Sequence, residues 1–200
     1  MSLLGLDIGT TGCKAIAFDE DGRPLASAYR EYPLLNPRSG FFELEPDLVW
    51  SHLADSVREV NGSIPDDPVK ALAISAQGEA VIPVSETSEV LANSPVTADN
   101  RALEQAEQLR QRLGAEKIYA ISGQPIHGQF SVPKIAWWKD HEPSLYQRTW
   151  KFLCYGDFAL QRLGLEPVID YSMAARMLGF DNRSLSWSEE LLGAAGVDAD

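Results

Sequence analysis

Near the N-terminus the chain reads Leu3-Leu4-Gly5-Leu6-Asp7-Ile8-Gly9-Thr10-Thr11-Gly12-Cys13-Lys14-Ala15-Ile16-Ala17-Phe18-Asp19. An apolar run ends on Asp7, a Gly-Thr-Thr-Gly turn follows, and a second apolar run leads away from it. This pattern predicts a β-hairpin whose tip is rich in glycine and hydroxyl groups. Glycine lets the backbone approach a phosphate closely, threonine donates to its oxygens, and a nearby carboxylate can hold magnesium. The residues alone leave two interpretations open, a nucleotide phosphate site or a tight turn with Asp7 as a polar strand end.

Composition narrows the class of protein. The 200 residues carry a net charge of −12, which argues against nucleic acid or an anionic membrane as a partner. The two cysteines, Cys13 and Cys154, provide neither a disulfide framework nor a Cys/His metal cluster, so we expect a reducing compartment. The sequence shows no signal peptide and no apolar run of the ~20 residues that a membrane helix needs. We therefore expect a cytoplasmic protein.

The hydrophobic pattern predicts an α/β domain. The first third is expected to form a three-strand meander over residues 3–9, 13–19 and 25–33, followed by a helix opening at Glu45-Pro46-Asp47. Residues 69–76 are almost wholly apolar and predict a strand buried on both faces. Further strands are expected at 80–85 and 94–97, and helices at 102–113, 131–139, 156–163, 171–177 and 188–192. We expect the apolar side of the 102–113 helix to include Leu103, and four tryptophans to be packing residues, namely Trp137, Trp138, Trp150 and Trp187.

The strand–hairpin–strand with Asp-x-Gly-Thr-Thr, followed by a strand and a helix, resembles the actin-like, ribonuclease H-like ATPase fold, in which helices flank a mixed β-sheet. Within that superfamily the chain resembles the FGGY carbohydrate kinases, which include xylulokinase, gluconokinase and glycerol kinase. Matching segments follow in order along most of the chain: Gly40-Phe41-Phe42-Glu43-Leu44-Glu45-Pro46-Asp47 with Trp50, Ala73-Ile74-Ser75-Ala76-Gln77-Gly78-Glu79, Asp99-Asn100-Arg101, and Ser122-Gly123-Gln124-Pro125 with Lys134 and Trp137. The order and spacing of these segments are specific.

Two departures keep the substrate open. Thr97 stands where the family usually has a tryptophan before its Asp-x-Arg segment. Gly78-Glu79 replaces the Met-His pair of typical xylulokinases and is closer to the Arg-Glu pair of glycerol kinase. The stretches around Asp99 and His127 are closer to gluconokinases. The resemblance therefore implies a kinase for a small sugar, sugar acid or polyol of the pentulose or gluconate type.

The resemblance also implies that the chain is one part of a larger enzyme. Family members have two actin-like domains with the active site between them, whereas residues 1–200 correspond to an incomplete N-terminal domain. We expect the catalytic base and much of the adenosine pocket outside these residues, and we expect the 200-residue chain alone to be inactive. A homodimer of the whole enzyme is left open.

Roles follow residue by residue from the resemblance. Asp7 is the expected catalytic and metal-orienting residue, holding Mg²⁺ next to the γ-phosphate of ATP. The phosphate-binding residues are expected to be Gly9, Thr10, Thr11 and Lys14, the last in place of a family arginine. The expected sugar-binding residues are Gln77, Glu79, Asp99 and Gln129.

Two of these roles have a structural alternative. Lys14 would otherwise be a plain surface lysine, and Asp99 would otherwise pair with Arg101 to brace the end of a strand. The alternative function is a nucleotide-binding sensor of the same fold that does no sugar chemistry.

Overall fold

The computed structural model describes residues 1–198, and these form two compact units. The first unit contains Met1–Leu35 and Leu44–Gln77, and the second contains Asn36–Glu43 and the described residues from Gly78 onward.

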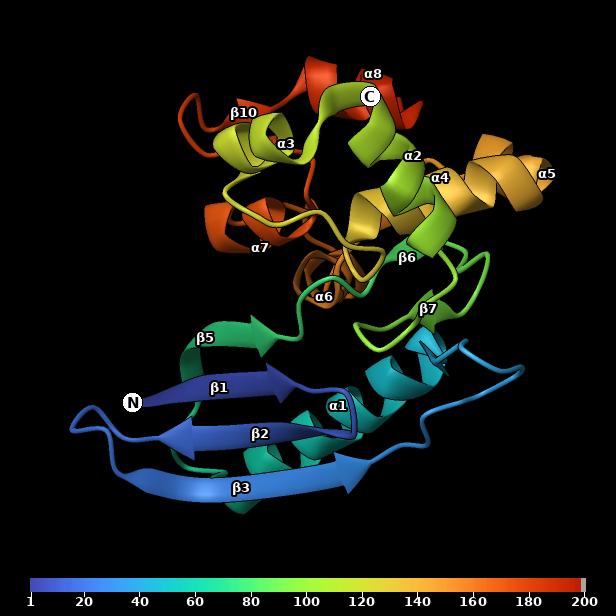
Figure 1. Cartoon of the computed structure of the whole chain (residues 1–200). Helices are drawn as coiled ribbons and strands as arrows, with labels where there is room; N and C mark the ends of the chain where they lie inside the picture. The colour runs from blue at the N-terminus through green and yellow to red at the C-terminus, as the bar shows by residue number, and fades with distance from the viewer. Residues whose placement is uncertain (199–200) are drawn as a thin grey trace. The chain divides into compact units, whose positions relative to one another are not determined.

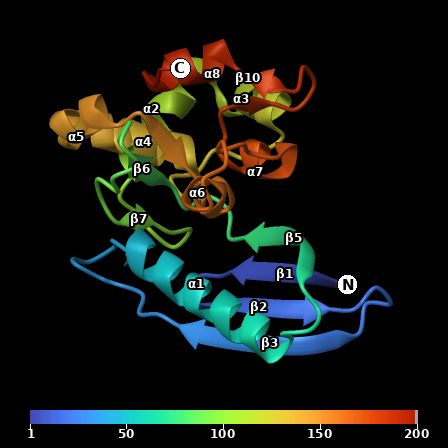
Figure 2. The ribbon, with the colours of Figure 1, turned by 180° about the vertical axis from the view of Figure 1, so that it is seen from behind.

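The first unit is a four-stranded mixed sheet with one long helix (Figures 1 and 2). The strand order is β3-β2-β1-β5, with bounds β1 Ser2–Ile8, β2 Gly12–Phe18, β3 Pro24–Glu31 and β5 Val69–Ala76. β1 is antiparallel to β2 and parallel to β5, as expected for a hairpin followed by a helical crossover. The three-strand meander predicted for the first third is confirmed, with bounds that differ by one or two residues.

Helix α1 (Pro46–Ser63) covers one face of this sheet, as Figure 2 shows. Its buried side chains recur at the helical period in Val49, Leu53 and Val60, and alternate residues of β2 supply the buried partner face of the sheet. Pro46 fits the first turn, where its missing N–H costs nothing. The opposite face of the sheet therefore carries the residues that alternate with the core, including Asp7 and Lys14.

The expectation that residues 69–76 are buried on both faces is wrong. β5 lies at the edge of the sheet with β1 as its one neighbouring strand, and most of its side chains are exposed, Leu72 to 44%. An apolar run records the composition of a strand but says nothing of how many neighbours cover it.

The second unit is mainly helical. Its helices are α2 Leu103–Leu113, α3 Ala115–Ser122, α4 Ser131–His141, α5 Pro143–Arg148, α6 Tyr155–Arg162, α7 Tyr171–Arg176 and α8 Glu189–Ala195. Its short strand pairs are β6 Ile82–Val84 with β8 Lys151–Leu153, and β9 Phe180–Asp181 with β10 Ser186–Trp187. Two further two-residue strands are β4 Glu43–Leu44 and β7 Ser94–Pro95. Helix α4 is central, because residues 131–138 are all buried in it and five of them belong to a hydrophobic cluster of the unit, namely Val132, Ile135, Ala136, Trp137 and Trp138.

Several predictions for this unit need correction. Leu103 is 48% exposed, and Trp150 and Trp187 are exposed, whereas Trp137 and Trp138 are in the core as predicted. Helices α3 and α5 were not predicted; Gly114 and Gly123 bound α3 in positive-φ conformations.

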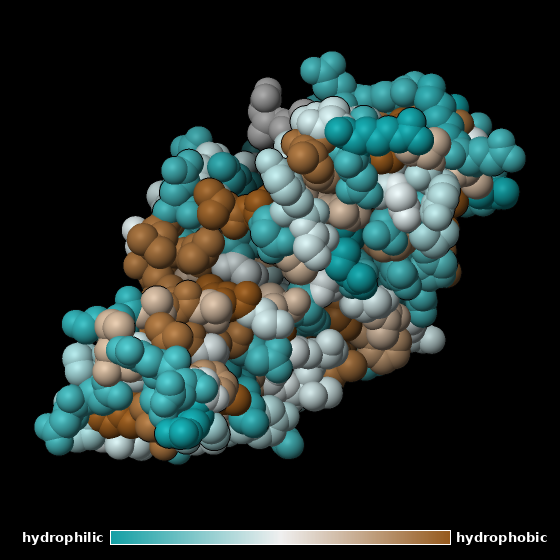
Figure 3. Space-filling model, turned by 90° about the vertical axis from the view of Figure 1, so that its left-hand side faces the viewer, coloured by the Kyte–Doolittle hydropathy of each residue, from teal (hydrophilic) through white to brown (hydrophobic). Residues whose placement is uncertain are grey.

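Figure 3 shows one face of the molecule, on which hydrophilic residues surround patches of hydrophobic ones. Within residues 1–198 no helix has both the length and the apolar character needed to cross a membrane.

Candidate functional site

The predicted hairpin joins β1 to β2 at its glycine-rich tip. The Gly9 amide donates to the Gly12 carbonyl over 3.0 Å and closes the turn. A Cβ at Gly12 would lie 2.5 Å from the Tyr29 hydroxyl and 2.7 Å from the Arg30 carbonyl oxygen. Glycine is therefore required at this position by close packing, and the turn is held tightly against β3.

Two side chains from other parts of the first unit fix the tip of the hairpin. The Tyr32 hydroxyl donates to the Gly9 carbonyl over 2.6 Å, and the Gln77 amide nitrogen donates to the same carbonyl over 3.2 Å. The Thr10 hydroxyl donates to the Gln77 amide oxygen over 3.1 Å. Burial raises the pKa of Tyr32, so its hydroxyl stays a donor at neutral pH. The tip is held in one shape before any ligand arrives.

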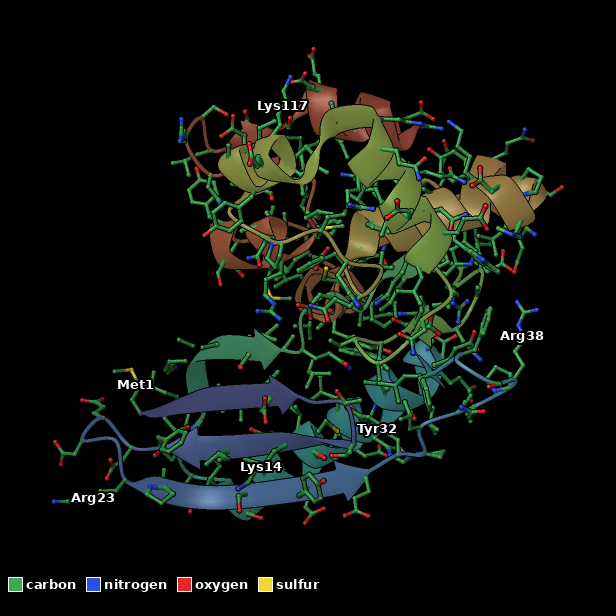
Figure 4. The ribbon with its side chains drawn as sticks, viewed as in Figure 1. Met1, Lys14, Arg23, Tyr32, Arg38 and Lys117 are labelled. Carbon is green, nitrogen blue, oxygen red and sulfur yellow. The ribbon has the colours of Figure 1, made fainter. Side chains whose placement is uncertain are left out.

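Asp7 and Lys14 are cross-strand partners on the face of the sheet that α1 does not cover. Both side chains are exposed, and Figure 4 shows Lys14 on β2, with Tyr32 beyond the end of β3. Among residues 1–198 neither Asp7 nor Lys14 has a hydrogen-bond or ion-pair partner. The free oxygens of Asp7 therefore fit a hard cation held through one carboxylate and waters. The described part of the chain contains no cluster of three metal-ligating side chains, so a closed metal cage is not built here.

Gln77 lies just after β5. Its backbone amide donates to the Ile8 carbonyl at the end of β1 over 2.8 Å. Its side chain bridges Gly9 and Thr10, so the structure gives it a bracing contact with the phosphate hairpin. A sugar contact of Gln77 stays a prediction.

Glu79 in the second unit has the most constrained conformation of the predicted site residues. Its φ is +61°, a left-handed value that is uncommon for a residue with a side chain. Its carboxylate accepts from Arg176 and, over 3.1 Å, from the Thr97 hydroxyl. Its carbonyl accepts from the Ser131 hydroxyl and from the Lys134 ammonium, each over 3.2 Å. The side chain is 1% exposed, so its surroundings fix it completely.

Asp99 has the contacts expected of a residue that pairs with Arg101 and braces the end of a strand. It is fully buried, and it accepts from the Arg101 guanidinium at 2.8 Å through both oxygens and from the Phe42 amide at 2.8 Å. Arg101 also donates to Glu43, and these bonds keep the pKa of Arg101 raised although burial alone would lower it. The Asp99 carboxylate thereby ties the 36–43 segment to the loop after β7. Sugar binding by Asp99 stays a prediction.

Gln129 is half-buried in the loop before α4, and its amide donates to His127 over 3.1 Å. The preceding residue, Gly128, packs so tightly that a Cβ would lie 2.8 Å from the backbone of Ala102 and Leu103. This close approach fixes the loop that carries Gln129 against the start of α2. Its sugar-binding role also stays a prediction.

Sequence reasoning assigned no role to three residues that organise these sites. They are Tyr32, Lys134 and Arg176. Lys134 is fully buried, and its ammonium donates to the carbonyls of Glu79, Pro95 and Val96. Burial lowers the pKa of Lys134 to about 7. The available signal was a lysine among the core positions of a helix, which is rare unless its charge has partners.

Residues 2–200 match the model for the N-terminal domain of the FGGY family of carbohydrate kinases. A gluconokinase from Bacillus licheniformis is 28% identical over 198 residues, covering 99% of this chain and 39% of the relative. A glycerol kinase from Thermococcus onnurineus is 30% identical over 201 residues, covering 98% of this chain and 41% of the relative.

A crystal structure of gluconate kinase from Lactobacillus acidophilus has the same fold, with a TM-score of 0.92 at 28% identity. The similarity covers 99% of this chain and 40% of that one. The chain thus spans about two-fifths of the length of the proteins it matches. The predicted actin-like α/β fold with a mixed sheet is confirmed by this similarity and by the topology of β1, β2, β3 and β5.

Proposed function

Because the chain belongs to the FGGY family of carbohydrate kinases, we propose that it is the N-terminal part of an enzyme that phosphorylates a small sugar, sugar acid or polyol with ATP. The observation that carries this proposal is the hairpin in the first unit. A fixed Gly-Thr-Thr-Gly tip lies next to Asp7, a carboxylate that the described residues leave unpaired on the open face of the sheet.

On the phosphate side, phosphoryl transfer needs mainly positioning and charge stabilisation. In the Gly9–Gly12 turn, Thr11 offers its backbone amide and hydroxyl as donors to phosphate oxygens, and Tyr32 and Gln77 keep the turn in one shape. Lys14 beside Asp7 adds a positive charge, although an ammonium cannot reproduce the fork of a guanidinium. Asp7 is the residue that would hold magnesium, which neutralises phosphate charge when bound.

On the sugar side, the candidate residues of the second unit are Glu79, Asp99 and Gln129, and Gln77 is a candidate in the first unit. The Glu79 and Asp99 carboxylates are buried and engaged by their own partners, so they support the proposal by holding neighbouring groups in fixed conformations, which limits the entropy lost when a ligand binds. The general base and much of the adenosine pocket belong, in this proposal, to parts of the enzyme outside residues 1–200.

The decisive test is a coupled ADP-release assay on the protein that contains this chain, with gluconate, xylulose, ribulose and glycerol as acceptors. A rate that depends on one of these acceptors would establish the reaction class and the substrate together. ATP binding without a rate for any acceptor would contradict the proposal and favour a nucleotide-binding sensor. The 200-residue chain, assayed in parallel, is expected to give no rate.

A further inference from the structure

Arg176, the last residue of α7, lies over Gly78 in the second unit. A Cβ built at Gly78 would collide with the Arg176 side chain, whose Nε and Cδ are its nearest atoms, the Cδ at 2.9 Å. The guanidinium therefore fills the space that a side chain at position 78 would take. The arginine reaches this place from 98 positions further along the chain.

The buried Glu79 carboxylate holds the guanidinium of Arg176 in place. One of its oxygens accepts from Arg176 Nη2, and the other accepts from Thr97. The Glu79 carbonyl is held by Ser131 and Lys134, so the acceptor of Arg176 is itself immobile. A planar guanidinium anchored at one nitrogen by a buried carboxylate keeps a defined orientation.

The two members of this ion pair differ in exposure. The Glu79 side chain is 1% exposed and the Arg176 side chain is 47% exposed. Among residues 1–198, Glu79 is the sole hydrogen-bond partner of the Arg176 side chain, which leaves the other guanidinium N–H groups free to donate. A ligand at this surface meets the donors of Arg176, whereas the oxygens of Glu79 lie underneath.

We propose that Arg176 is a sugar-binding residue of this site and that Glu79 acts as its positioning residue. Arginine has donors only, so the ligand atoms it binds are hydroxyl, carbonyl or carboxylate oxygens of the acceptor substrate. A carboxylate accepts from the guanidinium fork more strongly than a hydroxyl does, so a sugar acid gains most from this contact. The inference rests on the proposed function, because it names a contact within the acceptor site.

The test is steady-state kinetics of Arg176→Met in the protein that contains this chain, with the acceptor identified by the ADP-release screen. Loss of hydrogen bonds to a charged donor is expected to raise the KM for the acceptor about 10–100-fold, with the KM for ATP unchanged. Arg176→Lys keeps the charge without the fork and is expected to lie between Arg176→Met and the wild type. Comparing gluconate with neutral acceptors separates a carboxylate contact, which predicts the larger loss for gluconate, from a hydroxyl contact.

The Gly78→Ala variant tests the role of Arg176 in acceptor binding independently. It removes no polar group, yet its Cβ displaces the Arg176 side chain and is expected to raise the acceptor KM on the order of 5-fold. Combined with Arg176→Met it is expected to add nothing further, because the group it displaces is already gone. Arg183→Gln, an exposed arginine in the turn after β9, is the matched control and is expected to be silent.

Each outcome decides the matter. A folded Arg176→Met protein with an unchanged acceptor KM would overturn the role of Arg176 and leave the kinase proposal intact. A rise in acceptor KM for Arg176→Met, with additive effects of Gly78→Ala, would overturn the geometric link between these two residues. A wild-type protein that phosphorylates no acceptor would overturn the proposed function and this inference together.

Discussion

At the scale of single residues, Asp7 is the sharpest case. Its carboxylate is exposed beside the hairpin and has no partner among the described residues, so Asp7→Asn changes charge without disturbing packing. If Asp7 orients the metal at the phosphates, we expect kcat to fall by about 10²–10³-fold or more, in line with removal of one preorganised electrostatic group. Asp66→Asn, an exposed aspartate in the same unit, is the control in the ADP-release assay. Normal turnover of Asp7→Asn would remove Asp7 from the machinery.

Tyr32 offers a second test at this scale, because a matched tyrosine lies close by. Tyr32→Phe removes the hydroxyl that donates to the Gly9 carbonyl, whereas the Tyr29 hydroxyl is bonded to none of residues 1–198 and its side chain is exposed. We expect Tyr32→Phe to lower the free energy of unfolding by about 0.5–1.5 kcal/mol and to raise the KM for ATP. Urea titrations of Tyr32→Phe and Tyr29→Phe measure the first effect. Equal behaviour of the two variants would show that the hairpin does not need this bond.

At the scale of elements, the turn between β1 and β2 depends on the size of one residue. Gly12→Ala places a methyl group 2.5 Å from the Tyr29 hydroxyl and 2.7 Å from a backbone oxygen of β3. We expect it to destabilise the protein by about 1–3 kcal/mol, because the backbone of β3 cannot move aside freely. Gly62→Ala is the control: nothing lies within 4 Å of its Cβ position, and in α1 it is expected to stabilise by about 0.4–1 kcal/mol. Thermal melts of the Gly12→Ala and Gly62→Ala proteins distinguish these effects. A Gly12→Ala protein as stable as the wild type would show that the backbone of β3 moves to make room for the methyl group.

The helices and strands differ in how well the sequence predicts them. The hairpin and α1 were predictable, because alternation, the period of Val49, Leu53 and Val60, and Pro46 are all local signals. The exposure of β5 was not, because it depends on the strand lying at an edge. The contacts of Glu79 with Arg176 and of Gln77 with Thr10 were out of reach as well, since they join residues 97 and 67 positions apart. Candidate site residues could be named from the sequence, whereas their partners required the fold.

At the scale of the whole molecule, the chain does not divide at a single point. The 36–43 segment leaves the first unit between β3 and α1 and belongs to the second, where the Glu43 carboxylate accepts from buried Arg101. A composition shift or linker cannot reveal such an excursion, because no boundary in sequence accompanies it. Removing the Arg101 guanidinium would leave the largely buried Glu43 and Asp99 carboxylates without their positive partner, so this segment and the loop after β7 depend on each other.

The pH dependence of stability also belongs to this scale, because one buried acid affects the folding equilibrium of its whole unit. Burial in α6 raises the pKa of Asp157 from 3.8 to about 7. The hydrogen bond that its carboxylate accepts from the Cys154 amide lowers this pKa, but burial has the larger effect. Between about pH 4 and pH 7 the unfolded chain has lost this proton while the native state keeps it. Unfolding is therefore favoured progressively as pH rises through this window, and the loss is complete above pH 7.

Asp157→Asn removes that titration and keeps an oxygen that can accept from the Cys154 amide. We expect the stability of the variant relative to the wild type to increase by about 1–3 kcal/mol between pH 5 and pH 8. Urea midpoints at the two pH values measure this difference, with Glu86→Gln, an exposed carboxylate, as the control that stays flat. A difference that is the same at both pH values would mean that Asp157 is ionised in the native protein at pH 5. Its bond to the Cys154 amide would then outweigh the cost of burying the charge.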